Sequence, residues 1–247
     1  MTKIYEALVS ASRQQNYPEP AHPQPPALQL EPTISLTGKT NDTEMVTLYH
    51  AIESLLPGLN KRLIQFISSH PFEGTSTISR DFALFNAKQL HKRVLLIDSN
   101  RTRPSQNQFF GIPKTAGWQE LVTQQAGLID LLHPTRFDNL FLYPSSNSSK
   151  VTPEIFDPNV IHPFMESLRG QFDLVVIDAP PMSQSPDGLA VAPCVDGVIL
   201  VVEAEKTRWK VVEHNKNRLA ASGATLLGVV LNKRQYYVPD WIYRRLR

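Results

Sequence analysis

The chain has 247 residues, enough for one large domain or one domain with a tail, and its hydrophobic (41%) and charged (19%) fractions fit an ordinary globular protein. Its formal net charge of +2 gives no global reason to expect nucleic acid as a partner. The single cysteine, Cys194, excludes a disulfide framework and indicates a reducing compartment.

The sequence carries no sign of a membrane span or a secretory signal. No apolar run approaches the ~20 residues that a membrane span needs. Met1–Arg13 has no apolar core followed by a small-residue cleavage site. We therefore expect a cytoplasmic protein that must be recruited if it works at a membrane.

Two segments precede the region of regular patterning. Residues 1–14 place apolar side chains on one face of a short helix, which suits either a frayed terminus or a docking peptide. Residues 15–43 are expected to form an extended, disordered linker, because prolines crowd this stretch and large apolar residues are few. The apolar side chains are Ile4, Tyr5, Leu8 and Val9, and the prolines are Pro18, Pro20, Pro23, Pro25, Pro26 and Pro32.

Residues 44–235 show the alternating pattern of a folded α/β domain. The predicted elements, in chain order, are a helix at Glu44–Leu56, a strand at Leu63–Ile67, a helix at Thr75–His91, strands at Val94–Ile97 and Leu140–Tyr143, a helix at Phe156–Leu168, strands at Leu174–Ile177 and Val198–Val202, a helix at Thr207–Ala221 and a strand at Leu226–Leu231. Asp157 is the expected N-cap of its helix. Cys194 is expected to pack in a short core helix. Apolar strands that alternate with helices predict a mostly parallel sheet covered by helices on both faces.

The turn after the first predicted strand has the placement of a phosphate-binding loop. Such a loop reads G-x-x-x-x-G-K-[ST] between a strand and a helix, and here Gly74, Ser76 and Thr77 are in register. Ser69 stands at the first glycine and Thr75 at the lysine. Backbone amides would still cradle phosphate and Ser76 would still reach Mg²⁺, but a cation on the transferring phosphate is lost. Taken alone, the segment also fits a plain strand–helix turn of small residues.

Two aspartates end buried strands of the same domain. Asp98 follows Val94–Ile97, and Asp178 follows Leu174–Ile177. Open α/β sheets bind ligands at the carboxyl ends of their strands. Asp98 is predicted to hold a magnesium-bound water or to accept a proton from an attacking hydroxyl, with capping of the following turn as the alternative. Asp178 has the form of a Walker B aspartate, which binds Mg²⁺ through water.

These segments together resemble the bacterial tyrosine kinases of capsule and exopolysaccharide systems, a family within the MinD- and ParA-like class of P-loop ATPases. The family signatures are an E-G-K-S-T loop, an I-D-x-D-x-R-x-P strand end and an I-D-x-P-P strand end. In the wider class, the asparagine that ends the last strand contacts the adenine, which implies this role for Asn232. The segments that carry the resemblance are Ser68–Pro104, Phe172–Pro181, Asp196–Val202 and Leu227–Asn232.

The resemblance implies ATP and Mg²⁺ as cofactors. The implied nucleotide contacts are Gly74, Thr75, Ser76, Thr77 and Asn232. The implied metal contacts are Ser76, Asp98 and Asp178, and the two aspartates are also the candidate catalytic residues.

The resemblance also implies a partner and a location. The partner is the inner-membrane polysaccharide chain-length or co-polymerase protein, which would recruit the chain to the inner face of the plasma membrane and activate autophosphorylation on a tyrosine-rich tail. A homo-oligomer belongs to the same picture. Residues 236–247 form an aromatic and basic tail, which suits a membrane surface, an acidic partner or packing back onto the domain. Its candidate phosphoacceptors are Tyr236, Tyr237 and Tyr243.

The chain departs from the family pattern in four places. Thr75 replaces the loop lysine, and Asn100 replaces the second aspartate of the strand-end motif, which argues against efficient phosphotransfer. The helix at Glu44–Leu56 lacks the arginines of the family's oligomerisation helix, and the tail has no dense tyrosine cluster.

Three functions follow as hypotheses. The favoured one is a kinase-like regulator of polysaccharide polymerisation and export, with ATP-dependent phosphotransfer impaired or lost. The alternative is an active tyrosine autokinase of the same pathway, which needs another cation in place of the lysine; Arg80, Arg101 and Arg103 are the candidates. A MinD-like positioning ATPase fits the fold, but the opening Ile4–Leu8 and the ending Tyr236–Pro239 resemble the stand-alone cytoplasmic members of the kinase family instead.

Overall fold

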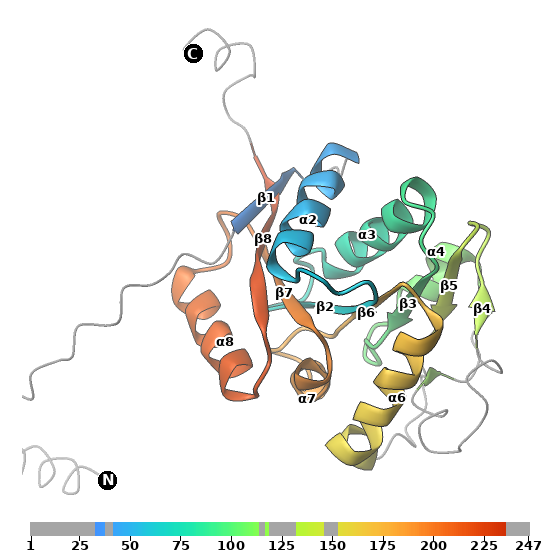
Figure 1. Cartoon of the computed structure of the whole chain (residues 1–247). Coiled ribbons are helices and arrows are strands. Elements are labelled where there is room, and N and C mark those ends of the chain that lie inside the picture. Colours follow the sequence, from blue (N-terminus) through green and yellow to red (C-terminus); the bar gives the residue numbers. More distant parts are fainter. Residues whose placement is uncertain (1–32, 38–41, 114–116, 119–131, 146–152, 236–247) are drawn as a thin grey trace, which may run out of the picture. The chain divides into compact units, whose positions relative to one another are not determined.

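The computed structural model describes residues 33–37, 42–113, 117–118, 132–145 and 153–235 (Figure 1). Eight strands form one sheet in the order β1-β8-β7-β2-β6-β3-β5-β4. Neighbouring strands are parallel except for the antiparallel pair β4 and β5. The strands are β1 (Thr33–Thr37), β2 (Arg62–Ser68), β3 (Val94–Asp98), β4 (His133–Pro134), β5 (Leu140–Tyr143), β6 (Leu174–Asp178), β7 (Gly197–Glu203) and β8 (Leu226–Arg234). The predicted fold class is confirmed.

Helices cover both faces of this sheet (Figure 1). They are α2 (Asp42–Leu55), α3 (Thr75–Gln89), α4 (Gln106–Phe110), α6 (Pro158–Gln171), α7 (Asp187–Val191) and α8 (Trp209–Ala221), with short 3-10 helices at Pro153–Phe156 and Ala192–Cys194. Alternate residues of a strand point to opposite faces. On β2, Ile64 and Phe66 pack with α2 and α3, whereas Leu63 packs with α6 and Ile67 with α8. Burial on both faces explains why the central strands are unbroken apolar runs.

Local signals in the sequence account for most element boundaries. The N–H of Asn159 donates to Oδ1 of Asp157 at 2.8 Å, so Asp157 caps α6 as predicted.

Cys194 ends a short 3-10 helix and is buried, and burial raises the pKa of its thiol. A packing role for this cysteine is therefore supported, and an activated thiolate is not.

The structure corrects the extent of the predicted linker. Residues 33–37 were expected to be disordered, but they form β1, which pairs in parallel with β8 through Thr33–Val229 and Ile34–Val230. Helix α2 also begins at Asp42, two residues before the predicted start of the domain at Glu44. The segment Thr-Ile-Ser-Leu-Thr is rich in β-branched residues, and without it the edge of β8 would be unpaired. The prolines before it outweighed this short signal in the sequence pattern.

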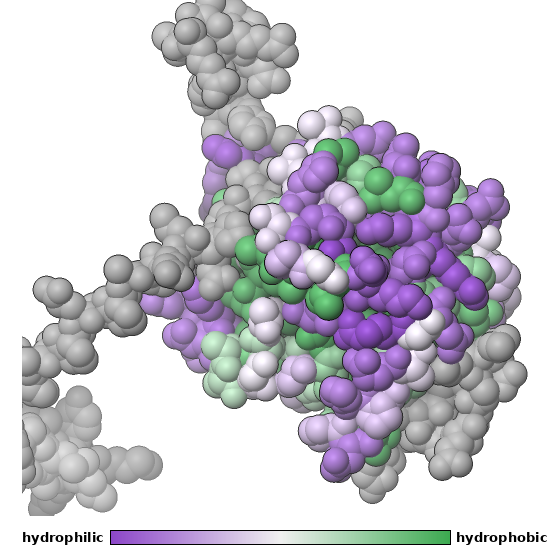
Figure 2. Space-filling model, viewed as in Figure 1, coloured by the Kyte–Doolittle hydropathy of each residue, from purple (hydrophilic) through white to green (hydrophobic). Residues whose placement is uncertain are grey.

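Several predicted segments lie outside the described residues. These are the N-terminal segment 1–14, most of the linker, and the tail 236–247 with Tyr236, Tyr237 and Tyr243. Within the described residues, every helix is too short or too polar to cross a bilayer. The face seen in Figure 2 is largely hydrophilic with scattered apolar patches. On α2, Val46 and Leu55 are partly exposed, as single apolar side chains on a globular surface commonly are.

Candidate functional site

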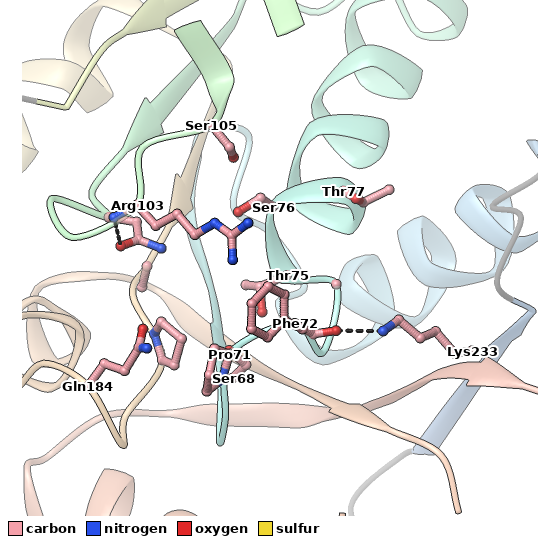
Figure 3. A pocket seen from close by; sticks show the side chains of 14 residues that line it. Ser68, Pro71, Phe72, Thr75, Ser76, Thr77, Arg103, Ser105, Gln184 and Lys233 are labelled. Atoms are coloured by element: carbon pink, nitrogen blue, oxygen red, sulfur yellow. Dashed lines mark hydrogen bonds between the residues drawn. The ribbon is translucent and has the colours of Figure 1, made fainter. Parts of the chain in front are cut away.

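A cavity of about 410 Å³ lies where β2 leads into α3, at the carboxyl ends of the central strands (Figure 3). The segments that line it are the β2–α3 loop, the turn after β3, the segment after β6 and the end of β8. The lining residues are Ser68, Pro71, Phe72, Gly74, Thr75, Ser76, Thr77, Asn100, Arg103, Ser105, Ala179, Pro181, Gln184 and Lys233. This is the position at which open α/β sheets bind ligands.

Gly74 begins α3 in a conformation that requires glycine. Its φ is 95°, in the left-handed region. A Cβ at this position would lie 2.1 Å from Nδ2 of Asn232, which donates to the carbonyl oxygen of Glu73 at 2.8 Å. Asn232, near the end of β8, therefore holds the β2–α3 loop in place. We call this contact between Asn232 and Glu73 the loop clamp. At the start of α3, the N–H of Thr77 already donates to the carbonyl oxygen of Gly74 at 3.1 Å, whereas Thr75 and Ser76, the first two residues of the helix, line the cavity and have N–H groups that an α-helix leaves without an internal partner.

A buried carboxylate shapes the start of the same loop, and the sequence reading did not single it out. Oε2 of Glu73 accepts hydrogen bonds from the N–H groups of Ser69 at 2.7 Å and His70 at 2.8 Å. Its Oε1 accepts a hydrogen bond from the hydroxyl of Thr207, just before α8. Glu73 therefore occupies the two amides at the loop's beginning, and the donors left for a ligand are those at the start of α3.

Thr75, at the lysine position, lines the cavity and has a buried hydroxyl. The residue is 6% exposed, and its Oγ1 has no hydrogen-bond partner among the described residues. Ser76 and Thr77 follow it along the cavity wall. Gly74, Thr75, Ser76 and Thr77 thus all line the cavity, and their role as a phosphate cradle stays a prediction.

Asn232 is not on the cavity surface, although the resemblance assigned it to the adenine. Its Nδ2 is used by the carbonyl of Glu73, and its Oδ1 accepts the N–H of Lys233 at 2.8 Å. The same strand end instead contributes Lys233 to the lining. In this structure Asn232 holds the loop in place.

Asp98 and Asp178 face each other across two neighbouring strands, and both are fully buried. The oxygens of Asp98 accept three backbone N–H groups, from Asn100 at 3.1 Å, Ser105 at 3.0 Å and Gln106 at 3.1 Å. Asp98 therefore caps the following turn, the alternative that the sequence left open. Oδ2 of Asp178 accepts Nε2 of Gln106 at 2.7 Å, whereas its buried Oδ1 has no partner among the described residues.

The charged forms of these two carboxylates are disfavoured. Burial, and then the charge of Asp178, raise the pKa of Asp98 from 3.8 to about 7. Burial raises the pKa of Asp178 from 3.8 to about 6, although hydrogen bonds from Gln106 and Ser76 and the charge of Arg80 oppose the rise. A cation beside Asp178 would favour its ionised form. In the described part of the chain, no three His, Cys, Asp or Glu side chains cluster to hold a metal.

The turn after β3 is held by a neutral side chain where the family motif has an aspartate. Oδ1 of Asn100 accepts the hydroxyl of Thr102 at 2.8 Å and the N–H of Arg103 at 3.1 Å. Aligning the motif on Asp98 and Pro104 also places Thr102 at the motif's arginine. Arg101 and Arg103 therefore lie on either side of the position that holds arginine in the family motif.

Sequence and structure comparisons agree on one group of relatives. Tyrosine-protein kinase CpsD of Streptococcus pneumoniae serotype 4 is 29% identical over 178 residues, covering 72% of this chain and 78% of the relative. Succinoglycan biosynthesis transport protein ExoP of Rhizobium meliloti is 28% identical over 186 residues, covering 74% of this chain but 24% of that longer protein. No protein-family model matches the chain.

The solved structures give the same answer for the fold. The kinase domain of VpsO has a TM-score of 0.68 and 27% identity, covering 78% of this chain and 95% of that one. The chimerical protein CapA2B2 has a TM-score of 0.73 at 23% identity, covering 83% and 95%. In both sequence and fold, the chain is similar to the bacterial tyrosine kinases. MinD from Pyrococcus horikoshii, solved with Mg-ADP, shares the fold with a TM-score of 0.60 at 20% identity, covering 75% and 77%. The VpsO kinase domain and MinD therefore share one fold with this chain.

Proposed function

We propose that the chain binds Mg²⁺·ATP in the cavity at the start of α3 and acts as a kinase-like regulator of capsule or exopolysaccharide polymerisation and export, with weakened phosphotransfer. The observation that carries the proposal is Thr75. It lies at the lysine position of a phosphate-binding turn that keeps Gly74, Ser76 and Thr77; the residue lines the cavity, and its buried hydroxyl has no hydrogen-bond partner among the described residues. A family member that keeps this turn without its lysine keeps the backbone donors but loses a charge that stabilises the transferring phosphate.

The residues present fit the proposed ligands. The unpartnered hydroxyl of Thr75 and the unpartnered Oδ1 of Asp178 are buried polar atoms of the kind that a bound ligand would satisfy. Ser76 and Asp178 would hold Mg²⁺, which supplies charge neutralisation on the phosphates when bound. Asp98 would serve the metal or act as a base only by giving up backbone hydrogen bonds. Asn232 would likewise need to release Glu73 or Lys233 to contact adenine.

The relatives support the wider setting of the proposal. Two of them bear names from tyrosine phosphorylation and succinoglycan transport. We place the chain on the cytoplasmic side of the membrane, recruited by a polysaccharide chain-length or co-polymerase protein. Tyr236, Tyr237 and Tyr243 are the proposed phosphoacceptors, in cis or from another kinase. Assembly into a homo-oligomer is part of the same proposal.

Restoring the lysine tests the shape of the site. We expect Thr75→Lys to tighten binding of a fluorescent ATP analogue with Mg²⁺ by about 1–3 kcal/mol, because a charge-assisted contact to phosphate is added. The measurement is a fluorescence titration of the purified protein. Gln89→Lys, which adds the same charge at the other end of α3, is the control and should leave affinity unchanged. An unchanged affinity in both variants would mean that the loop does not receive phosphate.

The alternative of an active autokinase is favoured by one observation, an arginine in the cavity wall. Transfer of radiolabel from ATP to tyrosine separates the two functions. We expect any transfer by the wild type to be slow and to be abolished by Asp178→Ala, because Asp178 is the buried carboxylate at the end of β6 whose Oδ1 has no hydrogen-bond partner among the described residues. Asp98→Ala should abolish it as well. Transfer that survives both substitutions would refute the assignment of these aspartates.

A further inference from the structure

One cationic side chain that lines the cavity forms no ion pair or hydrogen bond with another described residue. Two neighbouring cations are engaged. Arg101 donates to Oδ2 of Asp187 from Nε at 2.7 Å and from Nη2 at 2.6 Å. Nζ of Lys233 donates to the carbonyl oxygen of Phe72 at 2.6 Å and lies 3.3 Å from Oε2 of Glu203. Both are therefore held by groups of the protein itself.

A third candidate, Arg80, lies outside the cavity lining. Its guanidinium sits 3.9 Å from the ring centroid of Phe109, and its Nε is 3.9 Å from Asp81. Burial lowers its pKa, while the charges of Asp81 and Asp178 oppose that change. Its position suits electrostatic support of the buried aspartates more than contact with a ligand.

Arg103 differs from all three. It lines the cavity and is exposed, and among the described residues its side chain makes no ion pair or hydrogen bond. Its guanidinium lies 4.5 Å from the ring centroid of Phe72. Figure 3 shows it reaching from the β3 turn toward Phe72 and Ser76, at the start of α3. The Asn100 side chain fixes its backbone, as described above.

Phe72 is held at the mouth of the cavity in an unusual conformation. Its φ is 70°, in the left-handed region that bulky residues rarely adopt, and its side chain is 65% exposed. Lys233 fixes its carbonyl oxygen. The ring is thus presented outward, and the guanidinium carbon of Arg103 lies over it.

We propose that Arg103 is the phosphate-binding cation of this site, in place of the missing lysine, and that Phe72 positions it. A guanidinium that stacks through its face keeps its N–H edge free to donate to two phosphate oxygens at once. The ligand class is a nucleoside di- or triphosphate, recognised through its terminal phosphates. This inference rests on the proposed nucleotide site, but it concerns a residue that the lysine-bearing motif does not need.

The test compares two arginines that both stack on phenylalanine. Arg103→Ala should weaken binding of a fluorescent ATP analogue with Mg²⁺ about ten- to a hundredfold, as loss of a charged contact commonly does. Phe72→Leu should weaken it only about two- to fivefold, because the phosphate contact remains. Arg136→Ala removes an exposed arginine that stacks on Phe137 at 5.0 Å, away from the cavity, and should change nothing. Thr75→Lys added to Arg103→Ala should restore affinity.

Inorganic pyrophosphate is the second probe, used as a competitor. Arg103→Ala should weaken pyrophosphate as it weakens the nucleotide. A loss for the nucleotide alone would place Arg103 on the base or sugar and overturn the inference. If Thr75→Lys binds nucleotide and Arg103→Ala equals the wild type, the inference fails while the nucleotide site stands. If neither the wild type nor Thr75→Lys binds either probe, the proposed function fails together with the inference.

Discussion

At the residue scale, the buried pair Asp98 and Asp178 makes stability depend on pH. Both pKa values are higher in the folded protein, at about 7 and about 6, than the ordinary value of 3.8. The folded state therefore binds protons more tightly than the unfolded chain. The contribution of the pair to stability is complete below pH 4 and is lost as the pH rises through 6 and 7.

Asp178→Asn should reduce this dependence. The amide oxygen of the new asparagine can still accept the hydrogen bond from Gln106. The substitution also removes the negative charge that helps to raise the pKa of Asp98. We expect the variant to exceed the wild type in free energy of unfolding by about 1–3 kcal/mol at pH 8, with little difference near pH 4. Urea unfolding across this range measures it. Asp138→Asn, on the surface, is the control. Parallel pH curves for wild type and Asp178→Asn would contradict the prediction.

At the scale of elements, the β2–α3 loop depends on the end of β8. Gly74 combines a left-handed φ of 95° with close approach of Asn232, whereas Gly223, after α8, has a left-handed φ of 85° and open space around it. Comparing alanine at the two positions separates backbone strain from the loss of the clamp.

We expect Gly223→Ala to cost about 1–2 kcal/mol in the free energy of unfolding, from backbone strain alone. Gly74→Ala should cost roughly 2–5 kcal/mol, because the displaced Asn232 also leaves the carbonyl of Glu73 without its buried hydrogen bond. Urea unfolding measures both. Equal costs would show that Asn232 does not clamp the loop.

At the scale of the whole molecule, the folded domain begins at β1, closer to the N-terminus than the start at Glu44 that the sequence predicts. β1 pairs with residues 229–234 of β8, the same stretch that carries Asn232 of the loop clamp. A chain that begins at residue 31 should unfold at the same urea concentration as the full protein. A chain that begins at residue 44 should lose roughly 2–5 kcal/mol, because several backbone hydrogen bonds of the sheet are removed, and it should aggregate through the open edge. Equal midpoints for both shortened chains would show that β1 adds no stability.

The sequence by itself determined the central strands and the longer helices, and it predicted where the site would lie. Each central strand is a buried apolar run, each helix has its own periodicity, and Asp157 is a cap within its own segment. Gly74 and Ser76 lie two positions apart at the start of α3, a place that follows from the strand before it. These are local properties, so a linear reading finds them, and the family resemblance assigns their chemistry.

Only the tertiary structure decided which side chains serve the site. Asn232 reaches Glu73 across 159 positions, and Arg101 reaches Asp187 across 86. Asp98 was predicted at the correct strand end, yet whether its oxygens face a ligand or the backbone depended on the fold of the following turn. β1 was missed because its stability comes from pairing with β8, almost 200 residues away. Whether a charged side chain is paired within the protein depends on its neighbours in the folded structure, and those neighbours cannot be read from the order of residues in the chain.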